Sequence, residues 1–127
     1  MKHFTILIIE DSETSSMLIQ SLFSETDYYT ATIARNGSDA LRQIKNKKPD
    51  LVLLDIVLPD IDGFAILRRL KQNSQTKDIP VIIVSALYKQ ENRNLAKDLG
   101  AIDYVEKPLG VNKLFERVEK VIEQMSE

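Results

Sequence analysis

Hydrophobic residues gather in five short runs along the chain, and longer stretches with a helical period separate them. The runs cover residues 4–9, 30–34, 51–54, 81–84 and 102–105. Residues 6–9, 51–54 and 81–84 are apolar at every position, which is typical of strands with both faces buried. The pattern therefore predicts a parallel sheet that is covered by helices on both sides.

The stretches between the runs have apolar residues at helical spacing. The clearest follows the last run, where one stripe holds Val111, Leu114, Phe115, Val118, Val121, Ile122 and Met125. Further helices are predicted at 13–25, 38–46, 63–73 and 90–99. Asp62 precedes the third of these at an N-cap position, and Gly100 follows the fourth where a left-handed C-terminal cap would lie. The strand–helix alternation predicts one α/β domain with a doubly wound, five-stranded parallel sheet in the flavodoxin-like order 2-1-3-4-5.

Composition narrows the class of protein. The chain has 127 residues, the size of one domain, and its net charge of −2 argues against direct nucleic-acid or membrane binding. It has no cysteine, which excludes disulfides, thiolate metal sites and cysteine catalysis, and which fits a cytoplasmic protein. The N-terminal apolar run is too short for a signal peptide or a membrane span.

Polar residues follow the strands that are predicted to be neighbours. They are Glu10 and Asp11 after the first, Asp55 after the third, Ser85 after the fourth and Lys107 after the fifth. Taken singly, each reads as an ordinary loop residue, but in such a sheet they share the crevice at the strands' carboxyl ends. Clustered carboxylates repel one another unless a cation lies among them. The set therefore indicates a hard divalent cation, most simply Mg²⁺, and a site suited to a phosphoryl group.

These residues and their surroundings resemble the receiver domain of two-component response regulators, the CheY-like family. The resemblance extends over residues 4–125 and is carried by segments 8–12, 50–56, 58–63, 79–86 and 100–108. It implies a signalling phosphoprotein that catalyses only its own phosphorylation and dephosphorylation, and is otherwise not an enzyme. The receiver motifs fill residues 1–127, so we expect no output domain in this chain.

The resemblance also implies a role for each member of the acidic cluster. Asp55 is expected to be the phosphoacceptor, whose carboxylate becomes an aspartyl phosphate. Asp11 and Asp55 are expected to bind Mg²⁺ directly, together with the backbone carbonyl of Val57, and Glu10 through water. Mn²⁺ is the alternative metal.

Further roles fall on the ends of the last two strands. Lys107 is expected to pair with Asp55 and then with the phosphoryl oxygens, and Ser85 to hydrogen-bond one of those oxygens. The Lys107–Pro108 bond resembles the family's cis peptide. Tyr104 holds the position of the switch aromatic residue: phosphorylation would draw Ser85 inward, admit the Tyr104 ring and change the surface of helix four, strand five and helix five.

Val57 and Leu87 are apolar and are expected to flank the phosphoryl group. Neither can orient an attacking water, which predicts slow self-dephosphorylation. The expected partners are a histidine kinase or histidine phosphotransfer protein as donor and a downstream protein target. The sequence leaves two questions open: whether the protein forms a homodimer on phosphorylation, and whether the chain stands alone or belongs to a longer regulator.

Three other classes of protein compete with this interpretation. A flavodoxin-like flavin binder is disfavoured because Glu10 and Asp11 would repel the flavin phosphate. A haloacid-dehalogenase-type hydrolase needs a second carboxylate two residues after the nucleophile, where this chain has Val57. A receiver-like module that is never phosphorylated is disfavoured by the complete set of Glu10, Asp11, Asp55, Ser85 and Lys107.

Overall fold

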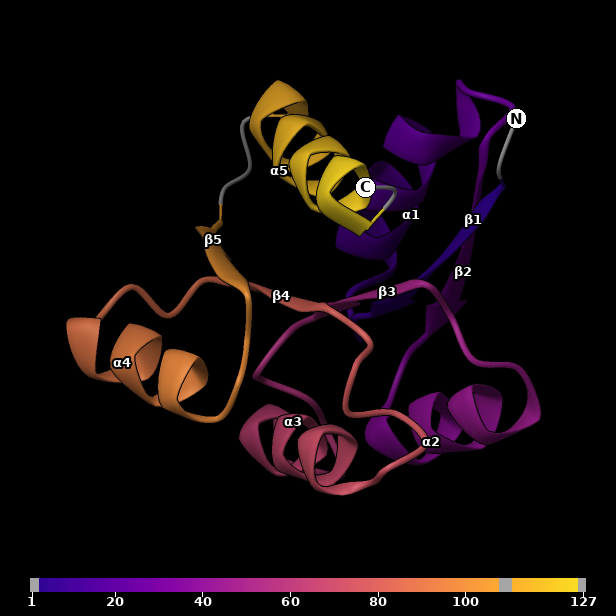
Figure 1. Ribbon diagram of the computed structural model, residues 1–127. Helices are drawn as coiled ribbons and strands as arrows, with labels where there is room; N and C mark the ends of the chain where they lie inside the picture. Colours follow the sequence, from indigo (N-terminus) through magenta and orange to yellow (C-terminus); the bar gives the residue numbers. More distant parts are fainter. Residues whose placement is uncertain (1–2, 108–110, 126–127) are drawn as a thin grey trace.

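A computed structural model describes residues 3–107 and 111–125 and shows five parallel strands in one sheet (Figure 1). The strand order is β2-β1-β3-β4-β5, as the sequence pattern predicts. The strands are β1 (Phe4–Ile9), β2 (Tyr29–Ala34), β3 (Leu51–Leu54), β4 (Val81–Ser85) and β5 (Asp103–Glu106). The doubly wound α/β fold is therefore confirmed.

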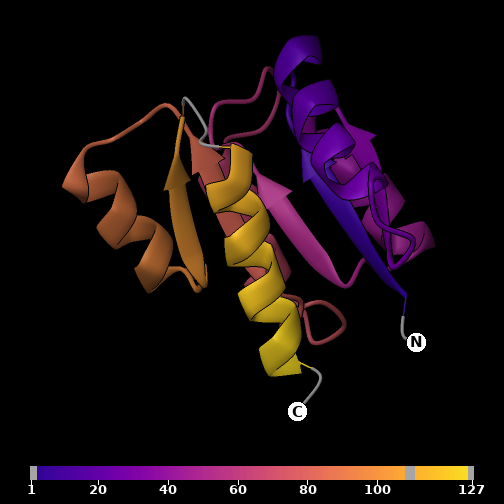
Figure 2. The same cartoon turned by 90° about the horizontal axis from the view of Figure 1, so that it is seen from above.

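Helices cover both faces of the sheet, with α1 and α5 on one face and α2, α3 and α4 on the other (Figures 1 and 2). No helix in the described part of the chain is long and apolar enough to cross a bilayer. The helices are α1 (Glu13–Ser24), α2 (Gly37–Asn46), α3 (Gly63–Gln72), α4 (Gln90–Asp98) and α5 (Val111–Met125).

The continuous apolar runs are explained by two separate cores. Along β1, Ile6 and Ile8 join the core beneath α1 and α5, whereas Leu7 and Ile9 join the core beneath α2, α3 and α4. Successive side chains of a strand point to opposite faces, so a central strand between two helical layers needs an apolar residue at every position.

The ends of several elements differ from the prediction by one residue. β5 begins at Asp103, and Ile102 lies before it with its side chain 50% exposed. At an edge strand an apolar residue need not be covered, so the run of apolar letters does not mark where pairing begins.

Both predicted caps are confirmed: Asp62 accepts a hydrogen bond from the Phe64 amide at 3.0 Å, and Gly100 has a φ of +104°.

The register of the sheet brings the polar strand ends together. Ile9 lies opposite Leu54, so the residues that follow them, Glu10 and Asp55, leave the sheet side by side. Ser85 lies opposite Glu106 on the neighbouring pair of strands. Because all five strands are parallel, these ends share one rim of the molecule.

Candidate functional site

Three carboxylates form an acidic cluster at this rim. Glu10 and Asp55 are 2% and 8% exposed, and Asp11 beside them is exposed. One carboxylate oxygen from each of Glu10, Asp11 and Asp55 lies within 4.8 Å of the other two. The backbone supports this placement, because the Asp55 amide donates to the Ile9 carbonyl at 2.9 Å. Three hard oxygen donors at this spacing are compatible with a divalent metal ion.

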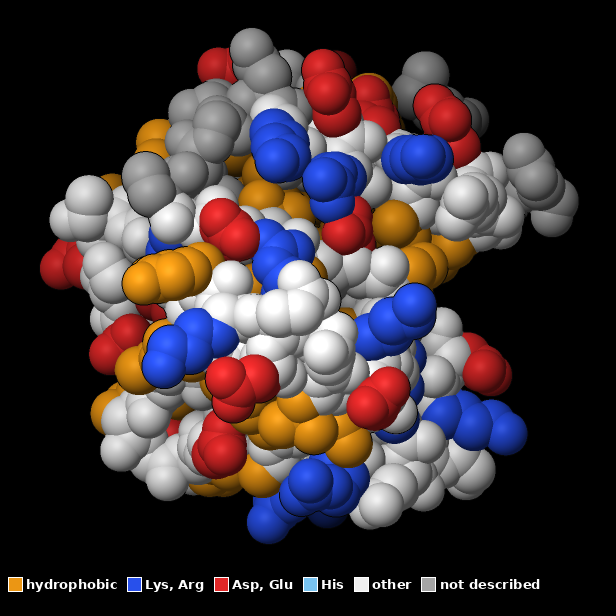
Figure 3. Space-filling view, turned by 90° about the vertical axis from the view of Figure 1, so that its left-hand side faces the viewer, with side chains coloured by type: hydrophobic (Ala, Val, Ile, Leu, Met, Phe, Trp, Pro, Cys, Tyr) orange, Lys and Arg blue, Asp and Glu red, His pale blue; other side chains and the backbone are white. Residues whose placement is uncertain are grey.

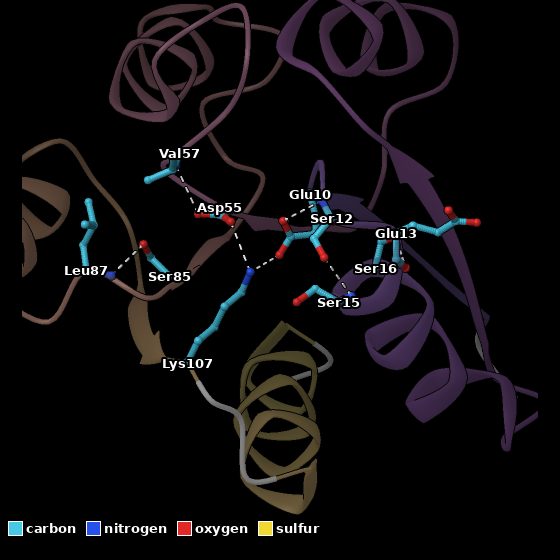
Figure 4. A network of polar contacts seen from close by, with 10 residues as sticks. All are labelled: Glu10, Ser12, Glu13, Ser15, Ser16, Asp55, Val57, Ser85, Leu87 and Lys107. Atoms are coloured by element: carbon cyan, nitrogen blue, oxygen red, sulfur yellow. Dashed lines mark hydrogen bonds and ion pairs between the residues drawn. The ribbon is translucent and has the colours of Figure 1, made fainter.

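Lys107 reaches across the rim to the same cluster. Its Nζ forms an ion pair with Glu10 and lies 3.1 Å from Oδ2 of Asp55 (Figure 4). The Lys107 amide donates a hydrogen bond to the Ser85 carbonyl at 2.8 Å, which holds the backbone of Lys107 beside β4. The sequence-based expectation paired Lys107 with Asp55, and the structure adds Glu10 as a second partner.

Burial and neighbouring charges shift the pKa values of this cluster. Burial raises the pKa of Glu10, and the charge of Asp55 raises it further, although the hydrogen bond from Lys107 opposes both. Burial by itself would lower the pKa of Lys107, but its hydrogen bond to Glu10 and the charge of Asp55 outweigh burial and raise that pKa. One ammonium therefore faces three carboxylates, and a further cation at this position would relieve their repulsion.

Ser85 and Val57 frame the carboxylate of Asp55. Ser85 is fully buried at the end of β4, and its Oγ accepts from the Leu87 amide at 3.2 Å (Figure 4). Because the Ser85 oxygen is the acceptor there, its own hydrogen can be donated elsewhere. The Val57 amide donates to Oδ1 of Asp55 at 3.1 Å, and the Val57 side chain is 58% exposed. Val57 and Leu87 both lie in loops that border the acidic rim.

Tyr104 lies buried beneath the loop between β4 and α4. It is 8% exposed, and its hydroxyl donates to the Leu87 carbonyl at 2.5 Å. Burial raises the pKa of Tyr104, whereas the Ser85 hydroxyl and the Arg93 guanidinium lower it. The expected switch residue is thus adjacent to Ser85, and its ring lies in the buried position that the resemblance assigned to the phosphorylated protein. The expected cis bond between Lys107 and Pro108 involves a residue outside the described ranges and stays a prediction.

Sequence reasoning missed two polar side chains that support this rim. Arg93 on α4 contacts the Tyr104 ring and pairs with Glu106, and nothing in the local sequence indicates either partner. Asp60 accepts from the amides of Gly37 and Ser38 at 2.7 and 3.0 Å, which ties the loop after Asp55 to the start of α2. A proline–aspartate turn was the only signal for Asp60, and it does not identify α2 as the partner.

The fold and the site define an α/β protein with an acidic, metal-compatible cluster and a lysine at the carboxyl end of a five-stranded parallel sheet. The family model described as "Response regulator receiver domain" matches residues 6–119. The chain belongs to this family, whose members are signalling components of two-component systems that interact with histidine kinases and downstream targets.

Relatives of different lengths share this domain. The chain is 39% identical over 121 residues to the transcriptional regulatory protein KdpE of Staphylococcus aureus, covering 95% of this chain and half of KdpE. It is 33% identical over 117 residues to protein PilH of Pseudomonas aeruginosa, covering 92% of this chain and 96% of PilH. The chain thus spans half of one relative and nearly all of the other.

Solved structures support the same assignment. The Mn²⁺-bound form of the response regulator Rcp1 has a TM-score of 0.81 and 28% sequence identity, over 93% of this chain and 91% of that one. The acidic cluster of Glu10, Asp11 and Asp55 is compatible with a divalent metal in this chain as well.

Proposed function

We propose that this receiver accepts a phosphoryl group on Asp55 and thereby changes a surface that binds a downstream protein. The observation that carries the proposal is the position of the Asp55 carboxylate. It lies at the sheet rim, 3.1 Å from the Lys107 ammonium, and shares an acidic cluster with Glu10 and Asp11. A nucleophile, a cation and further oxygen ligands are therefore gathered at one point.

The transfer step depends more on the position of the Asp55 carboxylate than on its reactivity as a nucleophile. One oxygen of the Asp55 carboxylate attacks the phosphorus of the donor, and a P–O bond forms. The bond from phosphorus to the donor breaks, and its electron pair leaves with the imidazole of a phosphohistidine or with acetate when acetyl phosphate is the donor. Catalysis of such a step depends on alignment and on neutralising the phosphoryl oxygens. Lys107 supplies one positive charge and Ser85 one hydroxyl donor.

The residues at this rim fit Mg²⁺, with Mn²⁺ as the alternative. Asp11, Asp55 and the backbone carbonyl of Val57 would bind the ion directly, and Glu10 through water. The ion would neutralise charge on the phosphoryl oxygens and on the carboxylates. Its hard character matches the all-oxygen donor set of the cluster.

The output surface in this proposal is formed by α4, β5 and α5. Figure 3 shows the side of the molecule that carries α4 and β5, where basic and acidic side chains are interspersed with hydrophobic ones. Exposed apolar residues here are Leu95 on α4, Tyr88 and Ile102 in the segments on either side of α4, and Met125 at the end of α5. Ser85 and Tyr104 connect the phosphoryl site to this surface, so a downstream protein or a second phosphorylated copy can sense the change.

The test is phosphorylation of the purified protein with acetyl phosphate and Mg²⁺, followed by intact-mass measurement. We expect one added phosphoryl group in the wild type and none in Asp55→Asn or in the presence of chelator. Asp98→Asn, which changes an exposed carboxylate on α4 in the same way, is the matched control and should be phosphorylated normally. Labelling that persists in Asp55→Asn would refute the assignment of Asp55.

A further inference from the structure

Arg93 makes two contacts with β5 that the proposed phosphoryl transfer does not use. Its guanidinium carbon lies 4.8 Å from the centroid of the Tyr104 ring, and the same guanidinium forms an ion pair with Glu106. Tyr104 and Glu106 are two residues apart on one strand, so both side chains point to the face that α4 covers. Arg93 therefore links α4 to both side chains at once.

These contacts belong to a closed chain of interactions around Ser85. The Tyr104 hydroxyl donates to the Leu87 carbonyl at 2.5 Å, and the Leu87 amide donates to the Ser85 hydroxyl at 3.2 Å. Ser85 in turn lies opposite Glu106 in the sheet, and the next amide, that of Lys107, donates to the Ser85 carbonyl at 2.8 Å. Arg93 closes the chain between Glu106 and Tyr104.

The chemistry of arginine suits this double contact. A planar guanidinium can stack on an aromatic face and at the same time donate from its edge to a carboxylate, whereas an ammonium is a point charge. The ion pair to Glu106 is partly exposed and would contribute little by itself. The same guanidinium contacts the ring of Tyr104, so one side chain makes both contacts.

We propose that Arg93 is a positioning residue that holds Tyr104 in its buried position. Tyr104 then holds the carbonyl of Leu87, and the Leu87 amide orients the hydroxyl of Ser85 toward the place of the phosphoryl group. This inference rests on the proposed phosphorylation of Asp55 and adds a determinant of its rate. A domain with Arg93 in place is preset for phosphoryl transfer, and loss of the guanidinium releases Tyr104 and slows the transfer.

The experiment combines a structural readout with a kinetic one. The protein is labelled with 3-fluorotyrosine, and the ¹⁹F solvent isotope shift between H₂O and D₂O reports the exposure of each of its four tyrosines. Tyr104→Phe assigns the Tyr104 signal, and Tyr88, 71% exposed, serves as the reference for a solvated ring. The rate of phosphorylation by acetyl phosphate and Mg²⁺ is then measured on the same variants.

We expect Arg93→Ala to move the Tyr104 signal toward the solvated value and to lower the phosphorylation rate about three- to tenfold. Arg93→Lys should give an intermediate result, because it keeps the charge but loses the planar stacking group. Arg117→Ala is the matched control. It removes the pair between α5 and Asp103, on the opposite face of the same strand, and should change neither readout.

Either of two results would overturn the inference. In the first, the Tyr104 signal or the phosphorylation rate is unchanged in Arg93→Ala. In the second, Arg93→Ala and Arg117→Ala have equal effects. Failure of the proposed function looks different, because the wild type itself would then take up no phosphoryl group. In that case the fluorine signal of Arg93→Ala still decides whether Arg93 holds Tyr104.

Discussion

Replacement of Lys107 by methionine removes the only ammonium that the described structure places among the three carboxylates. Lys107 pairs with Glu10 and lies 3.1 Å from Oδ2 of Asp55, and both of these carboxylates are almost fully buried. Methionine keeps the length and the apolar character of the side chain, so the loss is chiefly one of charge. Lys107→Met therefore leaves the Glu10 and Asp55 carboxylates without their cation.

The geometry sets the size of the effect. At 3.1 Å and an effective dielectric constant of about 20, one ion pair is worth about 5 kcal/mol before desolvation is counted. Removing one partner of a buried pair typically costs about 3–5 kcal/mol. Because the exposed Asp11 opens the cluster to water on one side, we expect the lower end, a loss of about 3 kcal/mol in the free energy of unfolding.

The loss should depend on pH in a definite direction. The pKa of Glu10 is already raised in the folded protein and rises further when the hydrogen bond from Lys107 is lost. A carboxyl group with a raised pKa destabilises the fold where it is charged, and the penalty falls as the pH drops through that pKa. The pKa of Lys107 is also raised. The stabilisation that its charge gives to the wild type is therefore complete at any pH below the ordinary lysine pKa of 10.5, and so in both neutral and mildly acidic solution. The difference between wild type and Lys107→Met should therefore shrink on acidification.

Urea denaturation at about pH 7.5 and about pH 5, with and without Mg²⁺, measures this difference. Lys97→Met, which removes an exposed lysine of α4, controls for the change in net charge. Mg²⁺ should stabilise Lys107→Met by an amount that grows with the logarithm of the Mg²⁺ concentration above the dissociation constant, because binding to the folded state alone shifts the equilibrium. The reasoning fails if Lys107→Met is as stable as Lys97→Met near neutral pH, or if its deficit is equal at both pH values.

Three further predictions follow from other parts of the structure. Gly63→Ala would place a Cβ 2.4 Å from a backbone Cα of the neighbouring loop, so urea denaturation should show a loss of about 2 kcal/mol; an unchanged midpoint would contradict this contact. Asp60 accepts hydrogen bonds from the first two amides of α2, and these bonds lower the pKa of Asp60 below the ordinary 3.8. The charged Asp60 therefore stabilises the fold fully above pH 3.8, and this stabilisation is lost as the pH falls below that value. Thermal melts of Asp60→Asn and wild type should therefore differ near neutral pH and converge in acid, whereas a gap that persists in acid would argue against this role. Val57→Asn combined with Leu87→Glu should speed the loss of the phosphoryl group about tenfold, because polar side chains there can orient water; phosphoprotein decay that is no faster would reject the assigned role of this pair.

The sequence by itself determined the layers of this protein and which polar residues follow its strands at the rim of the sheet. Strands with buried residues on both faces need apolar side chains at every position, so the runs at 6–9, 51–54 and 81–84 could be recognised without a structure. Parallel strands connected by helices deliver their carboxyl ends to one rim. For that reason Glu10, Asp11 and Asp55 could be grouped from their places after the strands alone, and the structure brings them within 4.8 Å of one another.

Only the tertiary structure decided which long polar side chains meet. Lys107 binds Glu10 as well as Asp55, Arg93 lies over Tyr104, and Asp60 reaches the start of α2. Each of these contacts joins two different elements or loops of the fold. Each also depends on a side-chain rotamer that neither periodicity nor local propensity specifies. A backbone pattern repeats and can be read from the chain, whereas a single polar contact depends on the three-dimensional position of both partners, and that position exists only once the sheet and its helices have packed.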